Sequence, residues 1–499
     1  MNTYIVTQKR MVKPLLIILL AFGFGSCNED FLNTVPTTNI SSSNSFDTPE
    51  RILNQVYGLY SSAKSSQLFG GRYIIYQELR GDEFLMNKPN VQTGQLTWSQ
   101  AVSSSTQEVT GMWSAGFATI NRINVFLDGL EANKDKVSDV LYTNYVAEGK
   151  LLRALCFFAL VQQYARPYAE NNGASLGLPL RLQAEKNSQN NDMERSTVAA
   201  VYTQIIKDLN DAEAGLPLSY TTATSTSTVA VLNSTRAHRN TAIALKARVY
   251  LVKGEYANVI TEASKIATGT TSITAPSGVA NKLETNVSTV FTGTYTGPEV
   301  LLTFPFNTAD TPGGQNALAY YFTFTTGNAE FYLNAAGTAS NPVFAAASTD
   351  TRKSFIAVQS GLTWMNKFKT PSTFADYVPV VRYAETLLNY AEAAARTGDL
   401  TTATNMLNAV RKRANPTFVF PAASINTQAA LINTILQERK IELLGEGFRT
   451  PDLQRLLQPL PAKTAPSATS PSVAVSDTKY VWPVSAAELS NNTAAVPNP

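Results

Sequence analysis

The chain has 499 residues, a formal net charge of +3, and charged side chains at only 15% of its positions. This length is enough for two or three lobes at roughly 150 residues per domain. So little net charge argues against nucleic acid as a partner, because proteins that bind nucleic acid present strongly basic surfaces. Neutral hydroxyl and amide side chains must instead make up much of the solvent-exposed surface. Such a surface suits an uncharged ligand such as a glycan.

Residues 1–26 have the pattern of a lipoprotein signal peptide. Three basic side chains precede an apolar run over residues 15–25, and a small residue stands directly before Cys27. Because a membrane-spanning helix needs roughly 20 apolar residues, we expect cleavage before Cys27 and lipidation of that residue. A plain secretory signal is the alternative. The acidic Glu29 and Asp30 resemble tags that carry some lipoproteins to the outer face of the outer membrane, so we expect a lipid-anchored, surface-exposed protein.

Cys156 is the other of the two cysteines. If Cys27 is lipidated, no partner is left for an intramolecular disulfide. Cys156 stands in the apolar run LLRALCFFAL, where a thiol behaves as a small hydrophobic group. We therefore expect it to pack in the core rather than to act as a nucleophile.

Apolar residues recur along the chain at spacings of three and four, which is the period of an amphipathic helix. Helices are predicted over residues 49–63, 106–131, 139–166, 196–214, 237–253, 255–267, 380–397, 399–414 and 427–446. Ser196 and Thr197 are placed to cap the fourth of them. The fold class is therefore mainly α.

Two helices open after a similar turn. Segments 253–266 and 397–410 each carry a glycine and an acidic residue just before the helix, and each follows a helix rich in Ala and Tyr. Glycine permits the tight turn between paired helices, and small residues let the pair approach closely. The pattern resembles tetratricopeptide repeat pairs, with Val259 replacing the expected Ala in the first.

Residues 268–350 lie between these pairs and are dense in Thr, Gly, Asn and Pro, with short β-type runs at VLLTFPF and AYYFTFTT. Compact domains rarely keep long loops without a use, so we expect either a recognition face or a solvated insert with a small sheet. Segment 218–235 is rich in Ser, Thr and Ala and predicts a flexible link. The tail at 459–475 should wrap over the surface.

Six phrases occur in the order and spacing of one family. They are EGKLLRALCFFALVQQYARPY (148–168), RSTVAAVYTQIIKDLNDAEAGLP (195–217), RYAETLLNYAEAAARTGDL (382–400), LNAVRKRA (407–414), ERKIELLGEGFRTPDLQRL (438–456) and KYVWPVSAAELSNN (479–492). On these phrases the chain resembles the SusD/RagB family of outer-membrane nutrient-binding lipoproteins over nearly all of its mature length.

The resemblance implies a scaffold of tetratricopeptide-like helical pairs with an irregular, loop-rich lobe that carries the ligand face. It divides the mature chain into an N-terminal helical region (27–267), the loop-rich insert (268–350) and a C-terminal region (351–499). It also implies a protein that binds a nutrient, most often a glycan, and delivers it to a TonB-dependent outer-membrane transporter of the SusC-like type. Such a protein needs no cofactor and does not cleave its ligand.

Charged residues recur along the last long helix and the turn after it. Their spacing brings opposite charges together. The group comprises Glu438, Arg439, Glu442, Glu446, Arg449 and Asp452, and Arg382 with Glu385 is similar. A structural ion network is the favoured interpretation, because paired charges commonly fix contacts between helices.

Two other classes of function stay open. The single histidine, His238, excludes a multi-histidine metal site, and no G-x-S-x-G motif is present. A lone histidine near a helix start is more often a cap or a surface residue. A glycosidase needs only two carboxylates, so an all-helical glycoside hydrolase is one alternative. A tetratricopeptide scaffold that holds a peptide or protein partner is the other.

A glycan site needs aromatic faces that stack on sugar rings and neutral groups around them. Trp98, in the polar segment GQLTWSQ, is the first choice of platform. Tyr320 and Tyr321 follow, and the alternation around them predicts that one faces the core and the other the solvent. The remaining candidates, which would hydrogen-bond the ligand, are Asn87, Asn90 and Gln95. Among the other tryptophans, Trp113 is expected in the core. Trp482 belongs to the WPV segment, for which we expect a structural role. Trp364 could lie in a strand or a loop, and the sequence does not assign it a role.

Overall fold

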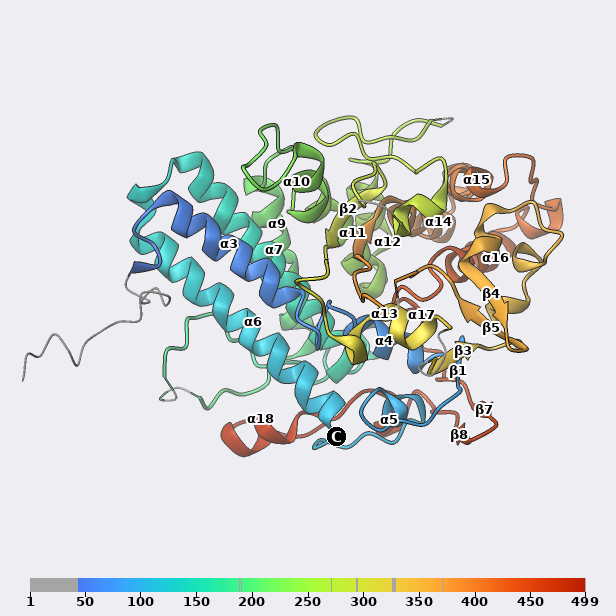
Figure 1. Ribbon diagram of the computed structural model, residues 1–499, viewed down its shortest axis with the longest axis horizontal. Helices are drawn as coiled ribbons and strands as arrows, with labels where there is room; N and C mark the ends of the chain where they lie inside the picture. The colour runs from blue at the N-terminus through green and yellow to red at the C-terminus, as the bar shows by residue number, and fades with distance from the viewer. Residues whose placement is uncertain are drawn as a thin grey trace, which may run out of the picture.

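The computed structural model describes residues 44–498, apart from residues 188, 190, 271, 293–294, 325–328 and 371. The signal peptide, Cys27 and the acidic pair behind it lie outside the described residues. The longer helices are α3 (Pro49–Ala63), α6 (Gln107–Ala132), α7 (Asp139–Tyr164), α9 (Val198–Gly215), α11 (Arg239–Lys253), α12 (Tyr256–Ala263), α14 (Tyr383–Thr397), α15 (Leu400–Ala414) and α16 (Gln428–Glu442). Each matches a helix predicted from apolar spacing, so the mainly α fold is confirmed (Figure 1).

Helices that follow one another closely in the chain pack together in the pairs α6–α7, α11–α12 and α14–α15. The α11–α12 and α14–α15 pairs turn at Gly254 and Gly398, whose φ angles of 77° and 95° are left-handed. A residue without Cβ adopts this conformation without steric cost, which explains the glycine in both turns. Helix α12 packs on α14, so the two tetratricopeptide-like pairs stack as the resemblance implied. Thr197 caps α9 by accepting a hydrogen bond from the Ala200 N–H at 3.1 Å, as predicted.

Short helices fill segments that apolar spacing did not assign. They are α4 (Arg72–Leu79), α5 (Gln95–Trp98), α8 (Tyr168–Asn171), α10 (Val229–Thr235), α13 (Leu318–Phe322), α17 (Arg449–Arg455) and α18 (Ala486–Asn491). Two of them contradict predictions. Helix α10 occupies the expected flexible link, because Thr228 caps it and Leu232 is buried. Helix α13 replaces an expected β run, because Leu318, Tyr321 and Phe322 share one buried helical face.

The strands form four separate antiparallel pairs rather than one sheet. They are β1 (Phe84–Met86) with β3 (Phe331–Leu333), β2 (Val300–Phe304) with β6 (Val378–Arg382), β4 (Ile356–Gln359) with β5 (Leu362–Met365), and β7 (Lys463–Ala465) with β8 (Ala468–Ser470). Strand β2 falls within the run VLLTFPF, as expected. Two pairs join the stretch after residue 268 to distant parts of the chain, namely β1–β3 and β2–β6. The boundaries proposed at residues 267 and 350 stay predictions.

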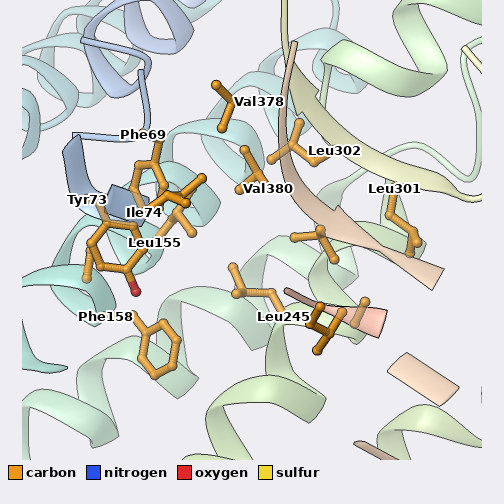
Figure 2. Close-up of a cluster of buried hydrophobic side chains, with 14 of the residues drawn as sticks. Phe69, Tyr73, Ile74, Leu155, Phe158, Leu245, Leu301, Leu302, Val378 and Val380 are labelled. Carbon is orange, nitrogen blue, oxygen red and sulfur yellow. The ribbon is translucent and has the colours of Figure 1, made fainter. Parts of the chain in front are cut away.

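Part of the core lies where helices from the first half of the chain meet the β2–β6 pair. Figure 2 shows Phe69, Tyr73 and Leu155 on one side of it, facing Val378 and Val380 of β6. Cys156, on the same helix as Leu155, is fully buried, and burial raises the pKa of its thiol to about 12. Its predicted packing role is confirmed.

The expected ion network is present and buried. Arg382 contacts Glu446 at 2.6 Å and Glu442 at 2.8 Å, which ties β6 to the end of α16. It also contacts Glu299 at 2.8 Å, next to β2. One expected neighbour pair is wrong, because Glu385 bonds Arg248 of α11 rather than Arg382. The network therefore holds together β6, the end of α16 and the residue just before β2.

No helix within the described residues is both long and apolar enough to cross a bilayer.

Candidate functional site

Trp98 is not the exposed platform that its polar surroundings predicted. It ends the one-turn helix α5, is 0% exposed, and donates its indole N–H to the Phe84 carbonyl at 2.9 Å. The ammonium of Lys463 lies 4.9 Å from the centre of its ring. Because the single turn of α5 points the indole inward, Trp98 is a core residue and cannot stack on a ligand in this structure.

Tyr320 and Tyr321 divide as expected between solvent and core, although they do so on a helix. Tyr321 is fully buried, bonds the Gln315 carbonyl at 2.9 Å, and lies nearly parallel to the Phe331 ring. Tyr320, one residue earlier on α13, is half-buried. Tyr320 is therefore the member of the pair whose ring can meet a ligand.

A buried carboxylate, Glu330, holds the polar groups around Tyr320. Its oxygens accept hydrogen bonds from the Asn90 amide at 3.1 Å and from the Thr93 hydroxyl, and the Tyr320 hydroxyl lies near them. Burial raises the pKa of Glu330, and these hydrogen bonds oppose the rise. Glu330 thus fixes loop 87–93 against the start of β3, close to the Tyr320 hydroxyl of α13.

A second anchor, Arg72, joins the start of α4 to the loop before α13. Its guanidinium donates to the Asn316 side chain at 2.6 Å and to the Gln92 carbonyl at 3.0 Å. At the neighbouring Gly71, an added Cβ would lie 1.8 Å from the Asn316 carbonyl oxygen, so only glycine permits this approach. Helices α4 and α13 lie together near the centre of Figure 1.

Phe374 completes the aromatic surface and was not predicted. Its ring centre lies 6.3 Å from that of Tyr320, and it is half-buried. Its φ angle of 55° is left-handed, which costs a bulky residue on the order of 1–3 kcal/mol. Strain of this kind is retained where the surroundings demand one side-chain position. The polar context of Phe374, PSTFADY, is the signal that could have found it.

The two remaining candidates occupy the same loop region. Asn87 lies just after β1, and its amide donates to the Ala329 carbonyl at 2.7 Å, so part of its hydrogen-bonding capacity links β1 to the segment before β3. Gln95 is the first residue of α5 and is partly exposed. Gln92 and Gln315, both exposed, were not predicted. The structure thus gathers Tyr320, Phe374 and neutral amides, which we call the Tyr320 face.

The lone histidine has no place in this face. His238 is the N-cap residue of α11 and is 0% exposed, so it is a cap but not a surface residue. Burial lowers its pKa to about 3, which keeps the imidazole neutral at physiological pH. Among the residues that the structure describes, no group of three or more His, Cys, Asp or Glu side chains is placed to hold a metal ion.

Comparison with known families gives two matches that adjoin this region. A family model described as SusD family matches residues 320–499, and one described as starch-binding associating with outer membrane matches residues 30–251. The first match includes Tyr320 and Phe374 and the second includes Asn90 and Gln92, while Gln315 lies between the two matched ranges.

Known proteins match over nearly the full chain. A crystal structure of a SusD superfamily protein from Bacteroides fragilis is 30% identical, with a TM-score of 0.79, over 90% of this chain and 99% of that one. A protein named SusD-like protein P38, from Formosa agariphila, is 22% identical over 94% of each chain. A structure described as a laminarin binding SusD-like protein is 19% identical, with a TM-score of 0.70, over 91% of this chain and 99% of that one.

Proposed function

Since the chain belongs to the SusD family, we propose that it is a cell-surface protein that binds a neutral glycan on the Tyr320 face. Two of the comparisons support the assignment of a glycan as the ligand. One matching family is described as starch-binding, and one structural neighbour as laminarin-binding. The lipid anchor at Cys27, the position at the outer membrane and the delivery of the ligand to a TonB-dependent transporter are parts of the same proposal.

The observation that carries the proposal is the fixed, half-exposed ring of Tyr320. The Tyr320 ring packs between Tyr321, at 5.8 Å between ring centres, and Phe374, at 6.3 Å, and the carboxylate of Glu330 lies near its hydroxyl. Rigid aromatic faces bind sugar C–H surfaces with little loss of conformational entropy. The Asn90 amide and the exposed Gln92 and Gln315 supply neutral hydrogen-bonding groups around the rings.

The charge of the Tyr320 face favours an uncharged ligand. The guanidinium of Arg72 is 4% exposed and donates to Asn316, Tyr76 and Gln92, and Glu330 is likewise buried and bonded. A charged ligand would find no free counter-charge in either group. Neutral hexose units match the amides and the aromatic rings instead.

A glycan array that includes starch and laminarin, probed with protein lacking residues 1–27, tests the proposal. Tyr320→Ala and Phe374→Ala should each weaken binding by about 1–3 kcal/mol, as for other aromatic anchors. Tyr142→Ala, a partly exposed tyrosine on α7, is the matched control and should bind as the wild type does. Equal binding by Tyr320→Ala and the wild type would exclude the Tyr320 face.

The same incubations separate a binder from a glycoside hydrolase. If the bound glycan is recovered without new reducing ends, the protein binds its ligand without cleaving it. New reducing ends that persist in a freshly purified sample would instead identify a hydrolase, and two carboxylates at a suitable separation would then have to be found.

The helix pairs α11–α12 and α14–α15 are the proposed contact with the transporter. Stacked helical pairs offer extended surfaces for protein partners. Affinity purification from native membranes should recover a TonB-dependent barrel. Replacing residues 268–350 should then abolish glycan binding and leave this association intact. Loss of the association with glycan binding retained would favour the alternative, a tetratricopeptide scaffold that holds a peptide or protein partner.

A further inference from the structure

A groove with a volume of about 520 Å³ lies between α16 and α17. This volume is within the range of ligand-binding sites. Helix α16 supplies one wall, helix α17 supplies the other, and Arg396 in the last turn of α14 also lines the groove. We call it the α16–α17 groove. None of the residues that line it belongs to the Tyr320 face.

Aliphatic side chains line both walls of the α16–α17 groove. They are Ile432 and Leu436 of α16, with Leu453 and Leu456 on the side of α17. Ile432 and Leu436 are half-buried and lie one turn apart, so they share one face of α16. Their neighbours Leu431 and Ile435 are fully buried in the core. Helix α16 therefore carries a second apolar strip that this chain covers only in part, and such strips mark sites of interaction.

The charge of the α16–α17 groove is positive. Three of its lining residues are cations, namely Arg396, Lys440 and Arg449, and one is an anion, Asp452. The carboxylate of Asp452 is already paired, because it accepts a hydrogen bond from Arg455 at 2.8 Å. A ligand in the groove therefore meets an excess of positive charge.

Part of this positive charge is not used within the described chain. The ammonium of Lys440 lies near Asp82 but forms no hydrogen bond or ion pair with a described residue. Arg449 donates to Asp82 through Nε at 2.5 Å and through Nη2 at 3.0 Å, which leaves its Nη1 over. This Nη1 is not one of the enclosed polar atoms, so a ligand can approach it.

The two kinds of lining group together favour an acidic peptide. A carboxylate is the natural partner of an ammonium and a guanidinium, and such charge-assisted hydrogen bonds are stronger than neutral ones. The half-buried Ile432 and Leu436 suit an aliphatic side chain. None of the lining residues is aromatic, so a sugar ring would find no stacking platform here. A peptide that carries both acidic and aliphatic side chains satisfies both halves of the groove.

We infer that the α16–α17 groove binds an acidic peptide segment of a partner protein. An aliphatic side chain of the segment packs against Leu436 and Leu453, and a carboxylate is bound by Lys440 and Arg449. Complementary charge of this kind gives specificity and speeds association. This function is separate from glycan binding, because the two sites share no residue.

Selection from a library of random heptapeptides displayed on phage, with protein lacking residues 1–27 as the bait, tests the inference. Retained peptides should carry Asp or Glu beside Leu, Ile or Val. Titration of a synthetic retained peptide should show about ten-fold or greater weakening by Lys440→Glu, the size of one charge-assisted hydrogen bond. Gln437→Trp, at an exposed position on the wall, should also weaken binding by filling the groove. Raising the salt from about 0.05 to about 0.5 M should weaken the wild type as well.

The matched control is Lys412→Glu, which changes an exposed lysine of α15 outside the groove and should bind the peptide as the wild type does. Melting temperatures show whether each variant is folded. If Lys440→Glu is unstable, the neutral Lys440→Gln takes its place and should still weaken the peptide. Glycan binding should be the same in all these variants, so a failure of this inference leaves the proposed function standing.

Three results would overturn the inference. The first is a selection that retains no peptide, or retains peptides without an excess of acidic residues. The second is an acidic peptide whose affinity is the same for the wild type, Lys440→Glu and Gln437→Trp. The third is binding of oligogalacturonate, but of no peptide, in a way that depends on Lys440, since the groove would then be a site for acidic sugars.

Discussion

The carboxyl group of Glu78, near the end of α4, accepts a hydrogen bond from the backbone N–H of Gly447 at 2.7 Å. These residues are 369 positions apart, and both are buried, so the contact joins the first described helices to the turn after α16. Burial raises the pKa of Glu78 to about 8, against an ordinary value of 4.5. At neutral pH this carboxyl group is therefore mainly protonated in the folded protein.

The raised pKa of Glu78 predicts that stability falls as the pH rises. Above pH 4.5 the unfolded state releases a proton that Glu78 keeps in the folded state. The contribution of protonated Glu78 to the free energy of unfolding is therefore complete below pH 4.5 and is lost as the pH rises towards 8. Glu78→Gln imitates the protonated form. The fall in the free energy of unfolding between pH 5.5 and 7.5 should therefore be smaller in this variant than in the wild type, by about 1–3 kcal/mol. Urea unfolding at both pH values measures this, with Glu50→Gln, on the exposed face of α3, as control. Identical pH dependence in Glu78→Gln and wild type would contradict it.

Trp98→Ala should destabilise the fold rather than only weaken ligand binding. The indole is fully buried and bonded to Phe84, so truncation leaves a cavity and costs about 3–5 kcal/mol. Chemical denaturation of the variant should show a clear fall in the transition midpoint. A midpoint equal to that of the wild type would mean that the indole faces solvent after all.

Arg382→Met should be among the most damaging single changes to stability. It leaves Glu442 and Glu446 buried with part of their counter-charge removed, and breaking a buried pair typically costs about 3–5 kcal/mol. Arg51→Met breaks the exposed pair with Asp47 and is the control, with an expected cost below about 1 kcal/mol. Equal costs for the two variants would show that the buried network is not structural.

Cys27→Ala should prevent membrane anchoring. Without the thiol that receives the lipid, the protein should stay soluble or keep its uncleaved signal. Fractionation of cells and labelling with a radioactive fatty acid measure both results. Lipidated protein in the outer-membrane fraction of the variant would exclude Cys27 as the anchor.

Apart from the two-turn α12, the helices that could be predicted from the sequence have four turns or more, which display the apolar period several times. One-turn elements do not display it, which is why α5 and α13 were not recognised and Trp98 was misplaced. The polar residues around Trp98 in the sequence indicate a loop, but a single helical turn is enough to point the indole into the core. Tertiary context, which short windows do not contain, decides such positions.

The candidate site was partly predictable for a related reason. Tyr320 and Asn90 were expected as ligand residues, and both lie near Glu330, which is bonded to Asn90 across 240 residues of sequence. No local pattern encodes that contact. Likewise, Glu385 pairs with Arg248, 137 residues away, although Arg382 is its neighbour in sequence. Long-range partners are set by packing, which a single sequence does not display.

The burial of Cys156 also bears on the protein's resistance to oxidation. A thiol whose pKa is about 12 is almost never a thiolate, and the thiolate is the form that oxidants and disulfides attack. With Cys27 taken up by a lipid, the mature chain would expose no reactive sulfur from cysteine to changing redox conditions. It would then neither cross-link to neighbours nor depend on an oxidising environment for its shape.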